Sequence, residues 1–351
     1  MDHWGLIHDL PPSWPLWAGE KSTELIRLSA ELFGDILGRD INTWATRSLP
    51  LNINGYTVTP MLTDHSAIDA YMLLIERDGR RILYGGDFRT HGRKSRLVET
   101  MIASPPGLLD VLLLEGTNLQ TDKPVVAEAE LEDTFAVLGR HTPGHVFVQW
   151  SAQNIDRTVT LYRAAKRTGR KLVLDLYGVD VLQRVSAGTR LPEPGPQFPE
   201  IRVLITPGGK RLYGRQGRDS FVSEMATSPF ATSRSRLVGD RAIIMTRDSM
   251  LDDFERAGLR FTSEDAYVFS NWSGYLDVED PKSGWARAQK GGAKTLKLHT
   301  SGHAAPADLL RFAQAMNPKA IVPVHGVSWD DPGLPFNAVR RLADGERWLI
   351  P

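Results

Sequence analysis

Short apolar segments alternate with helical segments through the second half of the chain, and this alternation restricts the fold more than any other feature. Helical apolar spacing covers 125–138 and 154–168, and each of these stretches precedes a strand-like segment. The strand-like segments lie at 145–150, 171–177, 201–205, 241–245 and 266–270. Because strands that are separated by helices usually run parallel, we expect a largely parallel sheet with both faces covered.

The first part of the chain has a different pattern, in which strand-like segments follow one another after a helical stretch at 22–37. Strands are predicted at 56–62, 70–76 and 80–84, with a hairpin turn at 77–80, and a buried strand at 111–115. The last part returns to alternation, with strands at 295–299 and 320–325 around a helix at 306–315. The sequence therefore predicts a hairpin-rich α/β unit, an α/β insertion, and a return to the first unit.

Composition excludes several classes of protein. The 351 residues contain 42 Lys and Arg against 42 Asp and Glu, so no global field attracts nucleic acid or an anionic membrane. The chain has no cysteine, which excludes disulfides and thiolate metal sites. No apolar run approaches the ~18–20 residues that span a bilayer, and no signal peptide is visible, so a cytoplasmic protein is expected.

Side chains that can bind a metal lie at or just after the ends of five predicted strands. They are His65, Asp87, Glu115, His303 and His325. Each of them alone is more often a turn residue or a hydrogen-bonded core residue than a ligand. Because ligands gather beyond the carboxyl ends of strands in α/β proteins, we expect the set to converge on one site.

The blocks that hold these residues resemble the metallo-β-lactamase fold, and in particular its β-CASP branch, which includes ribonuclease J. The blocks are DHS at 64–66, GGDFR at 85–89, LLLEGTN at 112–118, TSGHA at 300–304 and PVHG at 323–326. The resemblance implies an α/β protein with a metallo-β-lactamase αββα sandwich, incomplete at its N-terminus, and an inserted α/β β-CASP cap domain. The implied domains are 1–119 and 295–351 for the sandwich and 120–294 for the cap.

The resemblance also implies a role for each candidate residue. Asp87 would bridge two metal ions, His65 would bind the first ion, and His325 would bind the second. Asp2 and His3 match the end of the family's H-x-H-x-D-H motif and would also bind the second ion. His303 would be a general acid that Glu115 positions. Neutral imidazole and carboxylate suit zinc, and two such ions can generate a hydroxide near neutral pH.

One departure from the family pattern bears on this prediction, because the two histidines that precede Asp2 in the motif have no counterpart after Met1. We expect a start codon upstream of Met1; the alternative is a truncated chain that holds one zinc ion or none. The predicted activity is cleavage of RNA or another phosphodiester. The alternatives are hydrolysis of a small ester or phosphodiester, and a metal-poor relative that binds RNA or protein. The expected partners are the substrate and, as a second possibility, another copy of the chain; a membrane is not expected.

Basic residues cluster at 88–96, 163–171 and 210–218. Each cluster is interpreted either as a solvated surface or as a set of phosphate contacts.

Overall fold

The computed structural model describes residues 4–34, 37–45, 49–122, 124–331 and 333–350. The chain divides into two compact units. One comprises Pro12–Thr23, Asp40–Ala127 and Ser301–Pro351 and is called the mixed-sheet unit here. The other comprises Met1–Pro11, Glu24–Arg39 and Glu128–Thr300 and is called the parallel-sheet unit. In the described part of the chain, no helix is both long and apolar enough to cross a membrane.

A six-stranded sheet forms the mixed-sheet unit, in the order β15-β7-β6-β5-β4-β3. Its strands are β3 (Leu51–Ile53), β4 (Tyr56–Leu62), β5 (Tyr71–Arg77), β6 (Arg80–Tyr84), β7 (Val111–Leu114) and β15 (Ala320–Pro323). β3 to β6 pair antiparallel, whereas β6, β7 and β15 pair parallel. The predicted hairpin turn is confirmed: Asp78 and Gly79, with φ of 48° and 75°, reverse the chain between β5 and β6.

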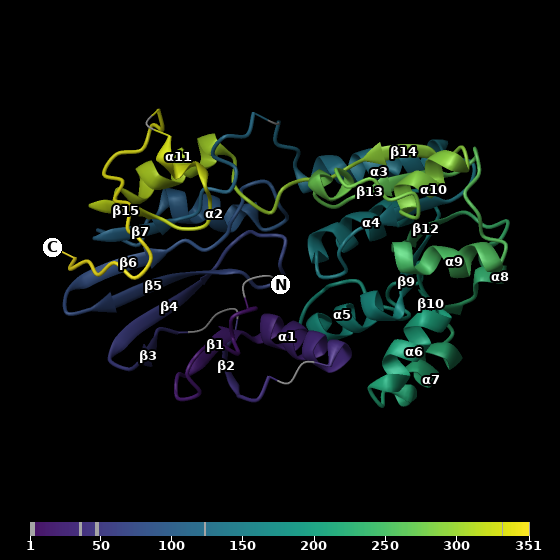
Figure 1. Cartoon of the computed structure of the whole chain (residues 1–351), viewed down its shortest axis with the longest axis horizontal. Helices are drawn as coiled ribbons and strands as arrows, with labels where there is room; N and C mark the ends of the chain where they lie inside the picture. Colours follow the sequence, from purple (N-terminus) through teal and green to yellow (C-terminus); the bar gives the residue numbers. More distant parts are fainter. Residues whose placement is uncertain (1–3, 35–36, 46–48, 123, 332, 351) are drawn as a thin grey trace. The chain divides into compact units, whose positions relative to one another are not determined.

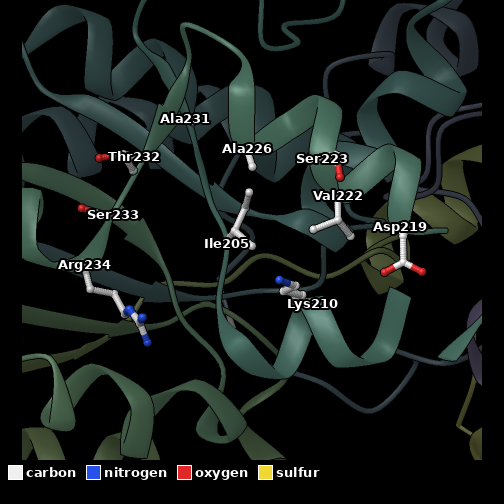
Figure 2. A pocket seen from close by; sticks show the side chains of 10 residues that line it. All are labelled: Ile205, Lys210, Asp219, Val222, Ser223, Ala226, Ala231, Thr232, Ser233 and Arg234. Carbon is white, nitrogen blue, oxygen red and sulfur yellow. The ribbon is translucent and has the colours of Figure 1, made fainter. Parts of the chain in front are cut away.

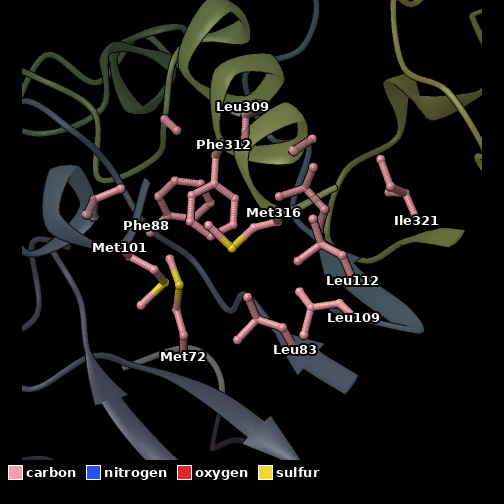
Figure 3. Packing of buried hydrophobic residues seen from close by; sticks show 14 of the residues in the cluster. Met72, Leu83, Phe88, Met101, Leu109, Leu112, Leu309, Phe312, Met316 and Ile321 are labelled. Atoms are coloured by element: carbon pink, nitrogen blue, oxygen red, sulfur yellow. The ribbon is translucent and has the colours of Figure 1, made fainter. Parts of the chain in front are cut away.

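Helices α2 (Ser95–Ala103) and α11 (Pro306–Met316) pack on this sheet and close its core (Figure 1). In Figure 3, Phe88 and Phe312 lie against each other, with ring centroids 4.7 Å apart. Met72 and Leu83 contribute from the sheet below them. The unit also contains a parallel pair of short strands, β1 (Leu16–Gly19) and β2 (Ile41–Trp44), and a 3-10 helix, η2 (Ser328–Asp330).

The parallel-sheet unit contains seven strands in the order β11-β10-β9-β12-β8-β13-β14, and every pairing between them is parallel. These strands are β8 (Val146–Gln149), β9 (Lys171–Asp175), β10 (Ile201–Leu204), β11 (Ala231–Thr232), β12 (Ala242–Met245), β13 (Ala266–Phe269) and β14 (Lys294–Lys297). The predicted parallel sheet is therefore confirmed. Strand β14 was expected in the returning part, but it pairs with β13 from Ala266↔Lys294 to Phe269↔Lys297. The residue boundaries of the expected domains remain a prediction.

Helices connect these strands, as the alternation of the sequence requires. They are α3 (Glu128–His141), α4 (Ile155–Arg167), α5 (Leu176–Ser186), α6 (Pro207–Arg215), α7 (Asp219–Thr227), α8 (Arg234–Leu237), α9 (Asp248–Arg256) and α10 (Gly284–Lys290), with the 3-10 helix η1 (Ser273–Leu276) after β13. Helix α1 (Glu20–Phe33) contributes residues to both units. The core between these helices and the sheet includes Phe147, Phe254 and Tyr267.

Candidate metal centre

The carboxyl ends of four strands bring the candidate residues to one edge of the six-stranded sheet. β4 and β6 are both antiparallel to β5, and β7 and β15 are parallel to β6, so all four end at the same edge. His65 follows β4, Asp87 follows β6, Glu115 follows β7, and His325 follows β15. His303 reaches the same place from the loop that precedes α11.

Asp87, His303 and His325 form a group whose ligand atoms all lie within 4.8 Å of one another. The Nδ1 atom of His325 lies 2.6 Å from Oδ1 of Asp87, and the Nδ1 atom of His303 lies 4.0 Å from the same oxygen. The ring of His65 lies 5.6 Å from the ring of His303, outside this group of three. The five predicted residues of the mixed-sheet unit thus lie together. Asp2 and His3, the other two predicted ligands, fall outside the described residues.

Glu115 holds His303 in one orientation. The Nδ1 atom of His303 lies 2.9 Å from Oε2 of Glu115, whose side chain is fully buried. The other carboxylate oxygen accepts hydrogen bonds from the backbone N–H groups of Phe88 and Ala304, at 3.2 and 3.4 Å. Because a carboxylate accepts, the His303 proton lies on Nδ1, and Nε2 is the atom that can exchange a proton with another group.

The loop that carries His303 is fixed by side chains from distant parts of the sequence. The Nδ2 atom of Asn118 donates to Oγ of Ser301 at 3.1 Å and to the carbonyl of His303 at 3.0 Å. The carbonyl of Ser301 also accepts from the buried guanidinium of Arg89, at 3.1 Å. Nε2 of His91 lies 3.0 Å from the same carbonyl. Asn118 and Arg89 were not predicted as site residues.

His65 is half-buried and neutral near pH 7, as a metal ligand must be. Its Nδ1 atom lies 2.6 Å from the carbonyl oxygen of Gly302, and since a carbonyl only accepts, the proton lies on Nδ1 and the lone pair on Nε2. Desolvation of the imidazole lowers the pKa of His65 to about 4. A Cβ atom at Gly302 would lie 2.8 Å from Cε1 of His65, so residue 302 must be glycine for His65 to keep this position.

The backbone at His325 adopts a conformation that non-glycine residues rarely populate. His325 has a φ of 53°, and its carbonyl accepts from the N–H of Gly116 at 2.7 Å. Gly326 follows with a φ of 143°, and a Cβ atom there would lie 2.7 Å from the backbone of Gly116. Strain of this kind is characteristic of functional sites, and here it directs the imidazole toward Asp87.

The donor set fits a divalent metal ion. It combines one carboxylate with imidazoles, and the tautomer of His65 is the one in which a second-sphere carbonyl holds the ligand ring. Asp87 and His325 are in direct contact. These residues would hold the ion, and His65 would add a further imidazole.

Comparison with known proteins shows which family the chain resembles. A family model described as "Zn-dependent metallo-hydrolase RNA specificity domain" matches residues 293–328, which include His303 and His325. Ribonuclease J of Mycobacterium tuberculosis is 24% identical over 281 residues, which cover 75% of this chain and 45% of that protein. Ribonuclease J of Thermus thermophilus is 24% identical over 286 residues, or 77% and 45% of the two chains. This chain is similar to the ribonuclease J-like metallo-β-lactamase/β-CASP family.

A solved structure shares the fold of this chain. A crystal structure of a protein of unknown function from Enterococcus faecalis V583 superimposes with a TM-score of 0.71 and 18% sequence identity. The superposition covers 96% of this chain and 75% of that chain. The predicted fold class, a metallo-β-lactamase unit with a β-CASP cap, is therefore confirmed. The chain spans less than half the length of the curated ribonuclease J relatives named above.

Proposed function

We propose that this chain is a metal-dependent hydrolase that cleaves phosphodiester bonds in RNA. The observation that carries the proposal is the convergence of Asp87, His303 and His325, with Glu115 behind His303, at one sheet edge. Both histidines of this group lie in the segment that matches the RNA specificity domain. The ribonuclease J relatives support RNA as the substrate class.

In the proposed mechanism, the residues would hold two zinc ions. Asp87 would be shared by the two ions, His65 would be a ligand of one, and His325, Asp2 and His3 would be ligands of the other. Divalent zinc supplies a nucleophile at neutral pH and offsets negative charge on the phosphoryl oxygens. The Nδ1 atom of His325 lies 2.6 Å from Oδ1 of Asp87, so these two side chains are placed to share one ion.

His303 acts as the general acid in this proposal. Its Nδ1 proton is held by Glu115, so a protonated ring donates from Nε2 to the oxygen of the leaving group. The hydrogen bonds from Asn118 and Arg89 to the 301–303 backbone keep this ring in place between turnovers. Asn118 and Arg89 are therefore positioning residues.

The test compares Asp87→Asn with Asp122→Asn, a matched change at an exposed carboxylate of the same unit. Zinc content is measured by mass spectrometry, and cleavage is measured on an end-labelled single-stranded RNA. We expect the wild-type protein and Asp122→Asn to hold zinc and cleave RNA, and Asp87→Asn to lose both together.

Two outcomes contradict the proposal and favour the alternative functions. A zinc-loaded wild-type protein that hydrolyses bis(p-nitrophenyl) phosphate or a lactone but leaves RNA intact would be a small-substrate hydrolase. The equal numbers of acidic and basic residues, 42 each, favour this alternative. A wild-type protein that binds RNA without zinc and without cleavage would be a binding relative.

A further inference from the structure

A cavity of about 450 Å³ lies in the parallel-sheet unit, and no candidate metal ligand lines it. It opens at the carboxyl ends of β10 and β11, where Ile205 and Ser233 directly follow the two strands. Parallel sheets bind their ligands at this edge. The volume lies within the range of small-molecule sites, roughly 300–1,000 Å³, and is too small for several nucleotides of a strand.

Opposite charges line the cavity without neutralising each other. Figure 2 shows Arg234 at one end and Asp219 at the other, with Lys210 between them. In the part of the chain that the structure describes, neither Lys210 nor Asp219 forms an ion pair within 4.0 Å. Arg234 shares its guanidinium with Asp253 and still lines the cavity. The two cations can bind an anionic group, and the carboxylate can accept hydrogen bonds from hydroxyl groups.

Apolar side chains form the wall between these charges. Val222 and Ala226 come from α7, and Ile205 and Ala231 come from the strand ends (Figure 2). Thr232 and Ser233 add hydroxyl groups on the side of Arg234. A ligand that fills this cavity therefore needs an anionic end, an apolar surface and hydroxyl donors, within the size of one nucleotide.

We propose that this cavity binds a ribonucleoside 5′-monophosphate. Lys210 and Arg234 bind the phosphate, Asp219 accepts from the vicinal ribose hydroxyls, and the wall of Val222 and Ile205 contacts the base. A carboxylate commonly recognises ribose hydroxyls in this way at parallel sheets. The cavity lies within the parallel-sheet unit, whereas Asp87, His303 and His325 lie in the mixed-sheet unit, so the inference goes beyond the proposed function.

The test is titration calorimetry with AMP, adenosine, inorganic phosphate and the 2′,3′-dideoxy analogue of AMP. All titrations use Asp87→Asn protein as well as wild type, because AMP could also bind at a metal centre. We expect AMP to bind equally to both proteins. We expect adenosine, phosphate and the dideoxy analogue each to bind about tenfold more weakly or worse, because each lacks a charge-assisted contact. AMP binding that disappears in Asp87→Asn would overturn the proposal, and so would equal affinity for AMP and its dideoxy analogue.

Substitutions test which residue binds the phosphate and which binds the ribose hydroxyls. Lys210→Met should weaken the affinity for AMP by about tenfold or more, whereas Lys210→Arg should retain the binding of AMP. Lys166→Met removes the same charge from an exposed site on α4 and should leave AMP affinity unchanged. Asp219→Asn should abolish the preference for AMP over its dideoxy analogue. The proposal fails if Lys210→Met and Lys166→Met bind AMP alike, or if Asp219→Asn keeps the wild-type preference.

Discussion

At the scale of single residues, the contact between His303 and Glu115 bears on whether His303 is a proton donor or a metal ligand. His303 lies in the group of three with Asp87 and His325, so its position alone suits either role. Its Nδ1 atom is engaged by a buried carboxylate that two backbone N–H groups also bind. This arrangement fixes the orientation of the ring. Separate measurements of metal content and rate decide whether Nε2 donates a proton or binds the metal.

We predict that Glu115→Gln and His303→Ala both retain the metal and lose activity. The glutamine amide would present N–H groups to Nδ1 of His303, and the orientation of the ring would be lost. We expect kcat to fall about 10–100-fold in Glu115→Gln and about 10²–10⁴-fold in His303→Ala. Glu99→Gln, an exposed change on α2, is the matched control and should change neither quantity. Metal loss in His303→Ala equal to that in Asp87→Asn would show that His303 is a ligand.

The sequence predicted the candidate site where local pattern was sufficient. His65, Asp87, Glu115 and His325 were predicted because each follows a strand with a recognisable apolar pattern. Asn118 and Gly302 were missed as contributors, because the contact between Asn118 and Ser301 spans 183 residues and nothing local announces it. Arg89 was grouped with surface cations at 88–96, but it is fully buried beside Asp64. Both interpretations of the cluster, a solvated surface and a set of phosphate contacts, are therefore wrong for Arg89.

At the scale of elements, helix boundaries were harder to predict than strands. The apolar segment 171–177 was predicted as one strand, yet β9 ends at Asp175 and Leu176 begins α5. The side chain of Asp175 accepts from the N–H of Gly178 at 2.8 Å and caps that helix. Asp175 is the residue in the sequence that indicates this boundary, but it lies within a continuous apolar run that is typical of a single strand. Helices α6, α7, α9 and α10 were not predicted at all.

A buried ion pair joins helices α3 and α4 of the parallel-sheet unit and contacts the segments that follow β13 and β14. Nε of Arg157 on α4 lies 2.8 Å from Oε1 of Glu128 on α3, and both side chains are fully buried. The same guanidinium donates to the carbonyls of Ser270 and Leu298, each at 3.3 Å, just beyond β13 and β14. Each side chain therefore neutralises the buried charge of the other, and the loss of one would leave an unpaired charge in the interior.

We predict that Glu128→Ala destabilises the parallel-sheet unit by about 3–5 kcal/mol, because it leaves the guanidinium buried without its carboxylate. The double variant Glu128→Ala, Arg157→Met should be less destabilised than Glu128→Ala alone, since no uncompensated charge remains. The measurement is hydrogen exchange of the β13 peptide by mass spectrometry. Arg163→Met, which removes an exposed pair with Glu132 from the same helix, should cost at most about 1 kcal/mol. A double variant that is less stable than Glu128→Ala would contradict this account.

At the scale of the whole molecule, the numbers of acidic and basic residues are equal, and some cations of the basic clusters have acidic partners. Arg167, from the cluster at 163–171, pairs with Glu132 and Asp133, and Arg218, from the cluster at 210–218, pairs with Asp180. These cations are neutralised by partners that sequence reading could not assign. These two arginines are therefore less available to RNA phosphates than their clusters in the sequence suggest.

The final prediction concerns which parts of the chain the metal stabilises. Ligands that bind only the folded state stabilise it by about 2.7 kcal/mol at 100 times Kd, and the gain falls on the segments that the ligand holds. We predict that zinc slows hydrogen exchange after β4, β6 and β15, where His65, Asp87 and His325 lie, and leaves β9 and β10 unchanged. The peptide that contains Asp2 and His3 should gain protection too, because both are predicted ligands. Asp87→Asn should gain none anywhere. If zinc protects the strand ends but not the peptide that contains Asp2 and His3, then Asp2 and His3 are not zinc ligands. His303 would then be the next candidate for a ligand beside Asp87 and His325.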